Sequence, residues 1–298
     1  MKRKMDKRKI IWYLLFSLGL LLFFTGLIMG LRSWKEYRDA ENFYENAKNT
    51  YVTIAKTAGK ADVPDYVNPE SGNTESSNAQ ALTEGSAVET GDASEPGQFA
   101  ANDSNEAWYQ WVQVDFERLR SINPDIIGWI WFENEDISYP VLQGSDNQQY
   151  LRRTYEGTSA VAGSIFAESL NSPDFSDSHT LLYGHNMHDG SMFGKLKNYR
   201  KEGYYAQHAY FQIITPHGHY RYQIFAYEDV EENSFIYQVP FGDNEDFAEF
   251  LDSLQEISMI QTDISVCSSD KIITLSTCSS TGRRFVVHAK QADIYPSP

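Results

Sequence analysis

Cysteine is scarce in this chain, which has only Cys267 and Cys278 among its 298 residues. Two cysteines cannot form the disulfide framework that stabilises small secreted domains. A bridge between these two would close a short loop and consume the thiol of Cys278. We therefore expect Cys267 to be a small apolar residue at a strand end and Cys278 to be a free thiol. At this length the chain can bury a sizeable hydrophobic core, in one or two domains.

Basic residues are also few, because 25 Lys and Arg against 41 Asp and Glu leave a formal net charge of −16. A general nucleic-acid-binding protein needs a basic face that neutralises phosphates. The sequence therefore predicts no nucleic-acid partner. The zinc-binding patterns CxxC and HExxH are absent as well, which removes the usual sequence evidence for a metal site.

Charged residues are missing from one long stretch, IIWYLLFSLGLLLFFTGLIMGL, at residues 10–31. These 22 residues are enough for a helix that crosses a hydrocarbon core of ~30 Å at ~1.5 Å per residue. A cleaved signal peptide has a shorter apolar region, of ~7–15 residues, that ends in small residues. Residues 1–9 carry six Lys or Arg against one Asp, and the basic side of a membrane span stays in the cytoplasm. The pattern predicts a cytoplasmic basic tail at 1–9, a single transmembrane helix at 10–31 and an extracellular remainder.

Two different segments follow the apolar run. Residues 32–57 lack glycine and proline, and tyrosine recurs every seven residues, at Tyr37, Tyr44 and Tyr51. This favours a juxtamembrane helix, either alone or paired with a second helix. Residues 58–104 are rich in Ser, Gly, Asn, Thr and Glu, a composition that cannot bury enough apolar surface to fold. We expect a disordered acidic linker there, acting as a tether for a folded domain at 105–298.

The C-terminal part contains eight short β-rich runs separated by turn residues: IIGWIWF, ISYPVLQ, GSIFA, HTLLYG, YFQIIT, HYRYQIFAYEDV, KIITLST and RFVVHAK. Such spacing predicts a mainly β fold, a closed or nearly closed barrel of about eight strands. TPHG at 215–218 is expected to form a hairpin connection. Helices are expected over 107–125, over 191–199 and, inserted before the last two strands, over 243–259.

Three kinds of residue with catalytic potential lie near expected strand ends. Cys278 follows KIITLST, and a reactive thiolate needs a base or a cation nearby. His185 directly follows a strand and a glycine, so its ring can project from the barrel rim. Arg283 and Arg284 precede the last strand, and a guanidinium can hold a carbonyl or a developing oxyanion. Side chains alternate along a strand, so only one arginine can face the same groove, and these residues alone favour neither.

Each of these residues also has an ordinary structural interpretation. A cysteine at a strand end more often packs than reacts, and a histidine in a loop is more often structural. A metal site formed by His185, His188 and Asp189 is a further alternative, although no companion motif accompanies it.

The motifs together resemble the sortases, specifically class B. The resemblance rests on TLSTC followed by RFVVHAK, on YGHNMHDGSMFGKL upstream, and on NPDIIGWI, ISYPVLQGSDNQQYL and GSIFAE, from about residue 105 to 295. It implies a sortase-like barrel behind one membrane helix. It also implies that Cys278 is the nucleophile, His185 the catalytic histidine and Arg284 the better match to the family arginine, with Arg283 as the alternative. A contribution of Thr277 to the oxyanion or substrate site is compatible with it.

The resemblance implies a cysteine transpeptidase of the Gram-positive cell surface that needs no cofactor. Its partners would be secreted proteins with a C-terminal sorting signal, NPxTN-like or LPxTG-like, and an amine of a cell-wall peptide or of a pilin lysine. The competing hypothesis is a tethered barrel that only binds. The aromatic residues Phe235 and Tyr237, ahead of the 243–259 helix, are candidates for the wall of a substrate groove.

Overall fold

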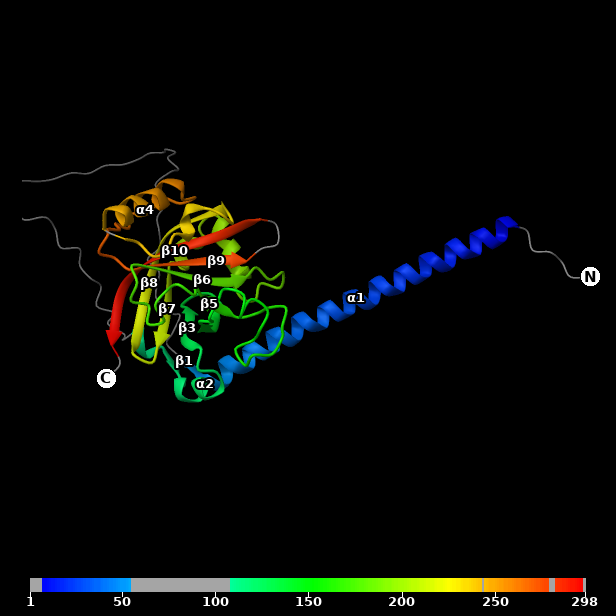
Figure 1. Ribbon diagram of the computed structural model, residues 1–298, viewed down its shortest axis with the longest axis horizontal. Coiled ribbons are helices and arrows are strands. Elements are labelled where there is room, and N and C mark those ends of the chain that lie inside the picture. The colour runs from blue at the N-terminus through cyan, green and yellow to red at the C-terminus, as the bar shows by residue number, and fades with distance from the viewer. Residues whose placement is uncertain (1–6, 55–107, 243, 279–281, 297–298) are drawn as a thin grey trace, which may run out of the picture.

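The computed structural model describes residues 7–54, 108–242, 244–278 and 282–296. The expected linker at 58–104 lies outside these residues, as does most of the basic tail. Figure 1 shows a β-barrel from which one long helix extends. That helix, α1, runs over Lys7–Tyr51.

Eight strands form a closed barrel in the order β10-β8-β7-β3-β4-β5-β6-β9. Their bounds are β3 Ile126–Phe132, β4 Ser138–Leu142, β5 Ile165–Ala167, β6 His179–His185, β7 Tyr210–Thr215, β8 Gly218–Glu231, β9 Ile272–Cys278 and β10 Arg283–Pro296. Each of the eight β-rich runs supplies one strand, so the predicted barrel is confirmed. The hairpin at 215–218 is confirmed too, because Thr215 and Gly218 are register partners.

Two of the barrel's pairings are parallel, β4 with β5 and β6 with β9. The other neighbours pair antiparallel. The carboxyl ends of two parallel neighbours lie at the same edge of a sheet, and such a pair needs a long crossover connection. Residues 186–271 form that connection between β6 and β9, and they include β7, β8 and the helix α4 at Asn244–Ile257.

The barrel encloses one hydrophobic core, and a second, smaller cluster lies between its outer face and α4. The buried residues of α4 are Phe247, Phe250, Leu251 and Leu254, a spacing that places them on one face of a helix. They pack on strands β8, β9 and β10 through residues such as Phe225, Ile272 and Val286. The helix expected at 243–259 is therefore confirmed, on the outside of the barrel (Figure 1).

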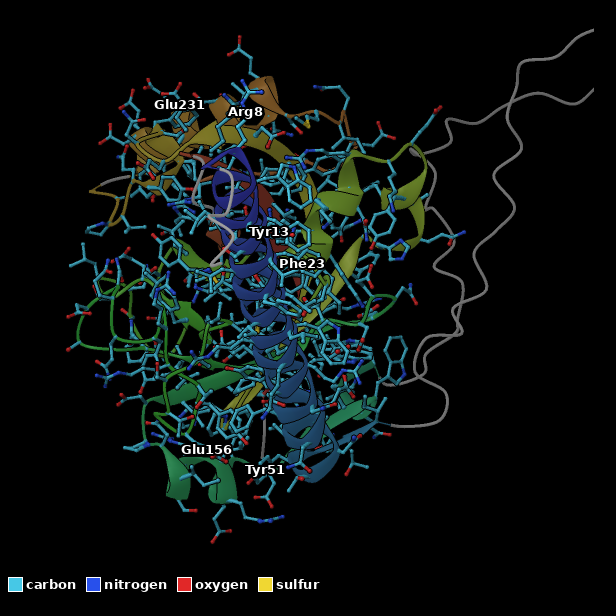
Figure 2. The ribbon with its side chains drawn as sticks, turned by 90° about the vertical axis from the view of Figure 1, so that its right-hand side faces the viewer. Arg8, Tyr13, Phe23, Tyr51, Glu156 and Glu231 are labelled. Carbon is cyan, nitrogen blue, oxygen red and sulfur yellow. The ribbon has the colours of Figure 1, made fainter. Side chains whose placement is uncertain are left out.

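The C-terminal end of α1 belongs to the barrel domain. Tyr44 and Ala47 are buried in the main core, and the helix runs directly into β1, Val52–Ile54, which pairs with β2, Val112–Val114. In Figure 2 the side from which α1 extends faces the viewer; Tyr51 marks the packed end of the helix and Arg8 the other end.

The last turns of α1 share the barrel's core, because Tyr44 and Ala47 bury apolar surface in it. Ile54 of β1 and Val112 of β2 are register partners. The division into a helix at 32–57, a linker at 58–104 and a domain at 105–298 stays a prediction. The heptad tyrosines face the barrel instead of a second helix.

Two expectations were wrong in part. The helix expected over 107–125 is limited to α2, Phe116–Ile122, capped by the Asp115 carboxylate, which accepts from the Arg118 N–H at 3.0 Å. Pairing with β1 holds residues 112–114 in a strand. Cys267 is exposed in a turn, where its N–H donates to the Asp270 carboxylate at 2.8 Å, so it is not a packed residue at a strand end.

Candidate active site

The site forms where the parallel strands β6 and β9 end. His185 is the last residue of β6 and Cys278 the last of β9, and their Cα atoms are register partners. The preceding pair is Gly184 with Thr277. Two residues that are 93 positions apart in the sequence thus lie side by side, held by the barrel's backbone hydrogen bonds.

The glycine of the YGH sequence, Gly184, lies where there is no room for a side chain. A Cβ atom on Gly184 would lie 2.5 Å from Ile165 Cδ1 and 2.6 Å from Phe193 Cδ2, closer than real carbon contacts allow. The Phe193 N–H also donates to the His185 carbonyl at 3.0 Å. The loop after β6 therefore folds back onto the strand end and holds the backbone of His185.

A groove of about 940 Å³ opens at this edge of the barrel. It is lined by residues of α1, β5, β6 and β10, by the connection between β4 and β5, by the 186–188 loop, and by two residues that follow β8. The lining residues are Tyr37, Asn147, Gln148, Leu151, Arg152, Val161, Phe166, Tyr183, His185, Asn186, Met187, His188, Glu232, Tyr237 and Arg284. Its size and mixed polar and apolar lining suit an extended peptide better than a small ion.

The two arginines are placed differently. Arg284 lines the groove, and its Nη2 lies 3.2 Å from the Glu232 carboxylate at the groove's edge. Arg283 is exposed, and its Nη2 donates to the Asp229 carbonyl at 3.2 Å. The structure therefore brings Arg284, and not Arg283, into the groove with His185.

Thr277 is turned away from the groove. It is buried, and its Oγ1 accepts a hydrogen bond from the Phe285 N–H at 2.8 Å, which links β9 to β10. Its hydroxyl is thus occupied in the barrel wall, and the expected contribution of this side chain to the substrate site is not supported by its position.

Of the two candidate groove aromatics, only Tyr237 lines the groove. Its hydroxyl lies 2.9 Å from Ser276 Oγ, and its ring stacks on Tyr183 at 6.3 Å. Phe235 instead packs edge-to-face against Phe250 of α4. Sequence reasoning missed Tyr183, although HTLLYGH places it two residues before His185 and so on the same face of the strand.

The residues of the metal alternative do not form a cluster. His188 is exposed, and Asp189 Oδ1 accepts from the N–H and the hydroxyl of Ser191, at 2.9 and 2.7 Å. Within the described ranges, no group of three His, Cys, Asp or Glu side chains is arranged to hold a metal ion.

A series of buried polar side chains links β6, β9, β10 and β8. His179 Nδ1 donates to the Gln238 carbonyl at 3.1 Å, and its Nε2 lies 2.7 Å from Thr274 Oγ1. The ring of His288 then joins Thr274 Oγ1 to the Glu228 carboxylate, 2.7 Å from each. Burial lowers the pKa of His179 to about 3, so this histidine is neutral and holds the segment next to Tyr237 in place.

Comparison with known proteins agrees with this architecture. The family model described as "Sortase domain" matches residues 132–292. Sortase B of Staphylococcus aureus is 38% identical over 184 residues, covering 60% of this chain and 75% of that protein. Sortase B of Listeria monocytogenes is 34% identical over 169 residues, covering 57% of this chain and 69% of that protein.

The fold gives the same result. The solved structure "Staphylococcus aureus sortase B-substrate complex" is similar with a TM-score of 0.57 and 35% identity, covering 61% of this chain and 85% of that one. The barrel of eight strands, with a helix before the last two, is thus similar in fold to a solved sortase B. The chain belongs to the sortase family and is a cysteine transpeptidase of the sortase B type.

Proposed function

We propose that this enzyme is a single-pass membrane protein that cleaves a C-terminal sorting signal after threonine and transfers the new carboxyl end to an amine. The signal is NPxTN-like or LPxTG-like, and the acceptor is an amine of a cell-wall peptide or of a pilin lysine. Cys278 is the nucleophile, His185 the proton carrier and Arg284 the residue that holds the reacting carbonyl. The pairing of His185 with Cys278 at the ends of β6 and β9 is the observation that carries this assignment.

The first half-reaction forms a thioester. The Cys278 thiolate attacks the carbonyl carbon of the threonine, and the carbonyl oxygen gains the negative charge that the Arg284 guanidinium stabilises. The C–N bond then breaks as the imidazolium of His185 gives its proton to the leaving amine. The acyl group remains on sulfur, and His185 is left neutral.

The second half-reaction reverses these roles. The incoming amine attacks the thioester carbonyl and gives a proton to the neutral His185. The C–S bond breaks, the thiolate of Cys278 returns, and an amide bond joins the substrate protein to its acceptor. One amide is broken and one is formed, so the cycle needs neither an oxidant nor a cofactor.

The membrane location is supported by α1. The stretch from Trp12 to Tyr51 is long and apolar enough to cross a membrane, and none of its apolar window is buried in the structure. The same helix contributes Tyr44 and Ala47 to the core, which favours a retained anchor over a cleaved signal. The six basic residues among the first nine favour a cytoplasmic N-terminus and an extracellular catalytic domain.

A peptide-cleavage assay on the full chain in detergent micelles tests the proposal. Peptides of both signal types are offered with triglycine or with a lysine side chain as the acceptor, and the products are identified by mass spectrometry. We expect Cys278→Ala to abolish cleavage and to remove the thioester adduct from the intact mass of the enzyme. Cys267→Ala, which changes an exposed thiol in a distant turn, is the matched control and retains full activity. Cleavage by the Cys278→Ala variant would contradict the assignment of the nucleophile.

A further inference from the structure

The ring of His185 is held by a backbone carbonyl of the groove wall. His185 Nε2 lies 2.7 Å from the carbonyl oxygen of Leu151, in the connection between β4 and β5. A carbonyl can only accept, so Nε2 carries the hydrogen in this contact. In the neutral ring, Nδ1 is then the nitrogen that can accept a proton.

The Leu151 carbonyl packs closely against Gly163, near the other end of the same connection. Gly163 has a φ of +58°, and a Cβ atom there would lie 2.4 Å from the Leu151 oxygen and 2.8 Å from the Tyr150 oxygen. Only glycine allows this close approach of two backbone segments. The next residue continues the contact, because the Ser164 N–H donates to the Tyr150 carbonyl at 3.1 Å.

The helix α1 holds Gly163 and Ser164 through one side chain. The Tyr44 hydroxyl donates to the Gly163 carbonyl and lies 3.1 Å from Ser164 Oγ. Tyr44 is only 5% exposed, and its ring packs edge-to-face on Tyr139 at 5.4 Å. Burial raises the pKa of Tyr44, so the hydroxyl stays protonated and remains a donor.

We propose that Tyr44 is a positioning residue for His185, acting through Gly163 and the Leu151 carbonyl. The contacts form a continuous series from the membrane-proximal helix to the ring that carries the proton. The inference rests on the proposed role of His185. It gives α1 a part in catalysis besides anchoring, because the helix fixes the acceptor that decides which ring nitrogen bears the hydrogen.

The first test removes the Tyr44 hydroxyl and keeps its ring, with Tyr44→Phe in the full chain in detergent micelles. Tyr51→Phe is the matched control, because Tyr51 lies on the same helix and packs on Tyr155 at 6.4 Å, but its hydroxyl makes no hydrogen bond among the described residues. We expect kcat to fall about 3- to 10-fold in Tyr44→Phe, as for one lost hydrogen bond, with KM unchanged. Tyr51→Phe stays at the wild-type level. Equal kcat values in the two variants would overturn the proposal.

The second test acts on the carbonyl itself. Gly163→Ala pushes a methyl group against the Leu151 oxygen, whereas Gly157→Ala in the same connection has a φ of +83° but no atom within 4 Å. Both changes strain the backbone, but only the first moves the acceptor. We expect kcat to fall about 100-fold in Gly163→Ala, the scale of a misplacement by about 1 Å, and several-fold less in Gly157→Ala. Similar losses in both would contradict the proposal.

The tautomer of the His185 ring is measured separately from enzyme activity. Nitrogen-15 NMR of labelled histidine reports which ring nitrogen carries the hydrogen. We expect the neutral ring of His185 to carry its hydrogen on Nε2 in the wild type and in Gly157→Ala, and on either nitrogen in Gly163→Ala. An unchanged ring in Gly163→Ala overturns the positioning role. A fully active His185→Ala variant would instead overturn the proposed function, while leaving the ring's tautomer in the wild type as it is.

Discussion

His185 and Cys278 are register partners on two parallel strands, each as the last residue of its strand. The barrel closes through both strands, so neither Cα can move without disturbing the hydrogen bonds of its neighbours. A site on strand ends is more rigid than a site on loops, and this rigidity suits a reaction whose partners must stay in contact through two half-reactions.

Arg284 and Arg283 make a matched pair for testing the anion-holding role. We expect Arg284→Ala to lower kcat/KM by about 10²- to 10³-fold, the range found for removal of a donor to an oxyanion. Arg283→Ala removes a guanidinium that is exposed and bonded to a backbone carbonyl, and it stays within about 3-fold of the wild type. Steady-state cleavage of the preferred signal peptide measures both. Equal losses would contradict the assignment of Arg284.

Gly184→Ala tests the packing behind the strand end. The added methyl group meets Ile165 and Phe193 at 2.5 and 2.6 Å, so we expect the free energy of unfolding to fall by about 1–3 kcal/mol, as for overpacking of a core. Gly242→Ala has no atom within 4 Å of its Cβ position and is the control. Urea unfolding followed by tryptophan fluorescence gives both values, and a stability loss shared by the two variants would contradict the argument.

His179 gives the domain a specific sensitivity to acid. Burial lowers its pKa from 6.5 to about 3, so between these two pH values the unfolded chain binds a proton that the folded chain does not. The free energy of unfolding therefore falls as pH falls below 6.5, by about 2 kcal/mol at pH 5 from this group alone. We expect His179→Gln to be less stable than the wild type at pH 7.5 and to lose about 2 kcal/mol less on acidification. Parallel stability curves for the two proteins would contradict this.

The N-terminal boundary of the domain is tested by three shortened chains. A chain of residues 105–298 lacks Tyr44 and Ala47, which are buried in the core, and we expect its free energy of unfolding to be about 3 kcal/mol lower than that of residues 32–298. Deleting only residues 58–104 keeps α1, β1 and β2, and we expect a change below about 1 kcal/mol. Thermal unfolding of the three chains distinguishes these outcomes. Equal stability of 105–298 and 32–298 would show that α1 does not belong to the domain.

Most of the barrel could be predicted from local sequence. Runs such as IIGWIWF and KIITLST combine β-branched and aromatic residues between turn signals, and each is a strand. The 244–257 helix could be predicted equally well, because Phe247, Phe250, Leu251 and Leu254 follow a helical period. Local pattern decides such elements, since their runs of apolar residues must be buried.

Predictions failed where a partner far away in the sequence decides the structure. VQV at 112–114 fits a helical pattern, but its pairing with residues 52–54 places it in a strand. The choice between Arg283 and Arg284 depends on which one turns into a groove assembled from segments far apart in the sequence, and no local pattern contains that information. The same holds for Leu151. It holds His185 through its backbone carbonyl, and every residue type has such a carbonyl, so the identity of the side chain does not predict the contact.

The uninterrupted helix α1 fixes the distance between the apolar stretch and the groove. The helix runs without interruption from the apolar stretch to Tyr51, and Tyr37, which lines the groove, follows Leu31 by six residues, or about 9 Å of helix. With residues 10–31 spanning a membrane as proposed, the part of α1 between Leu31 and Tyr37 keeps the reaction close to the lipid surface. Each residue added to or removed from this part of the helix would shift the groove by about 1.5 Å and rotate it by about 100° around the helix axis.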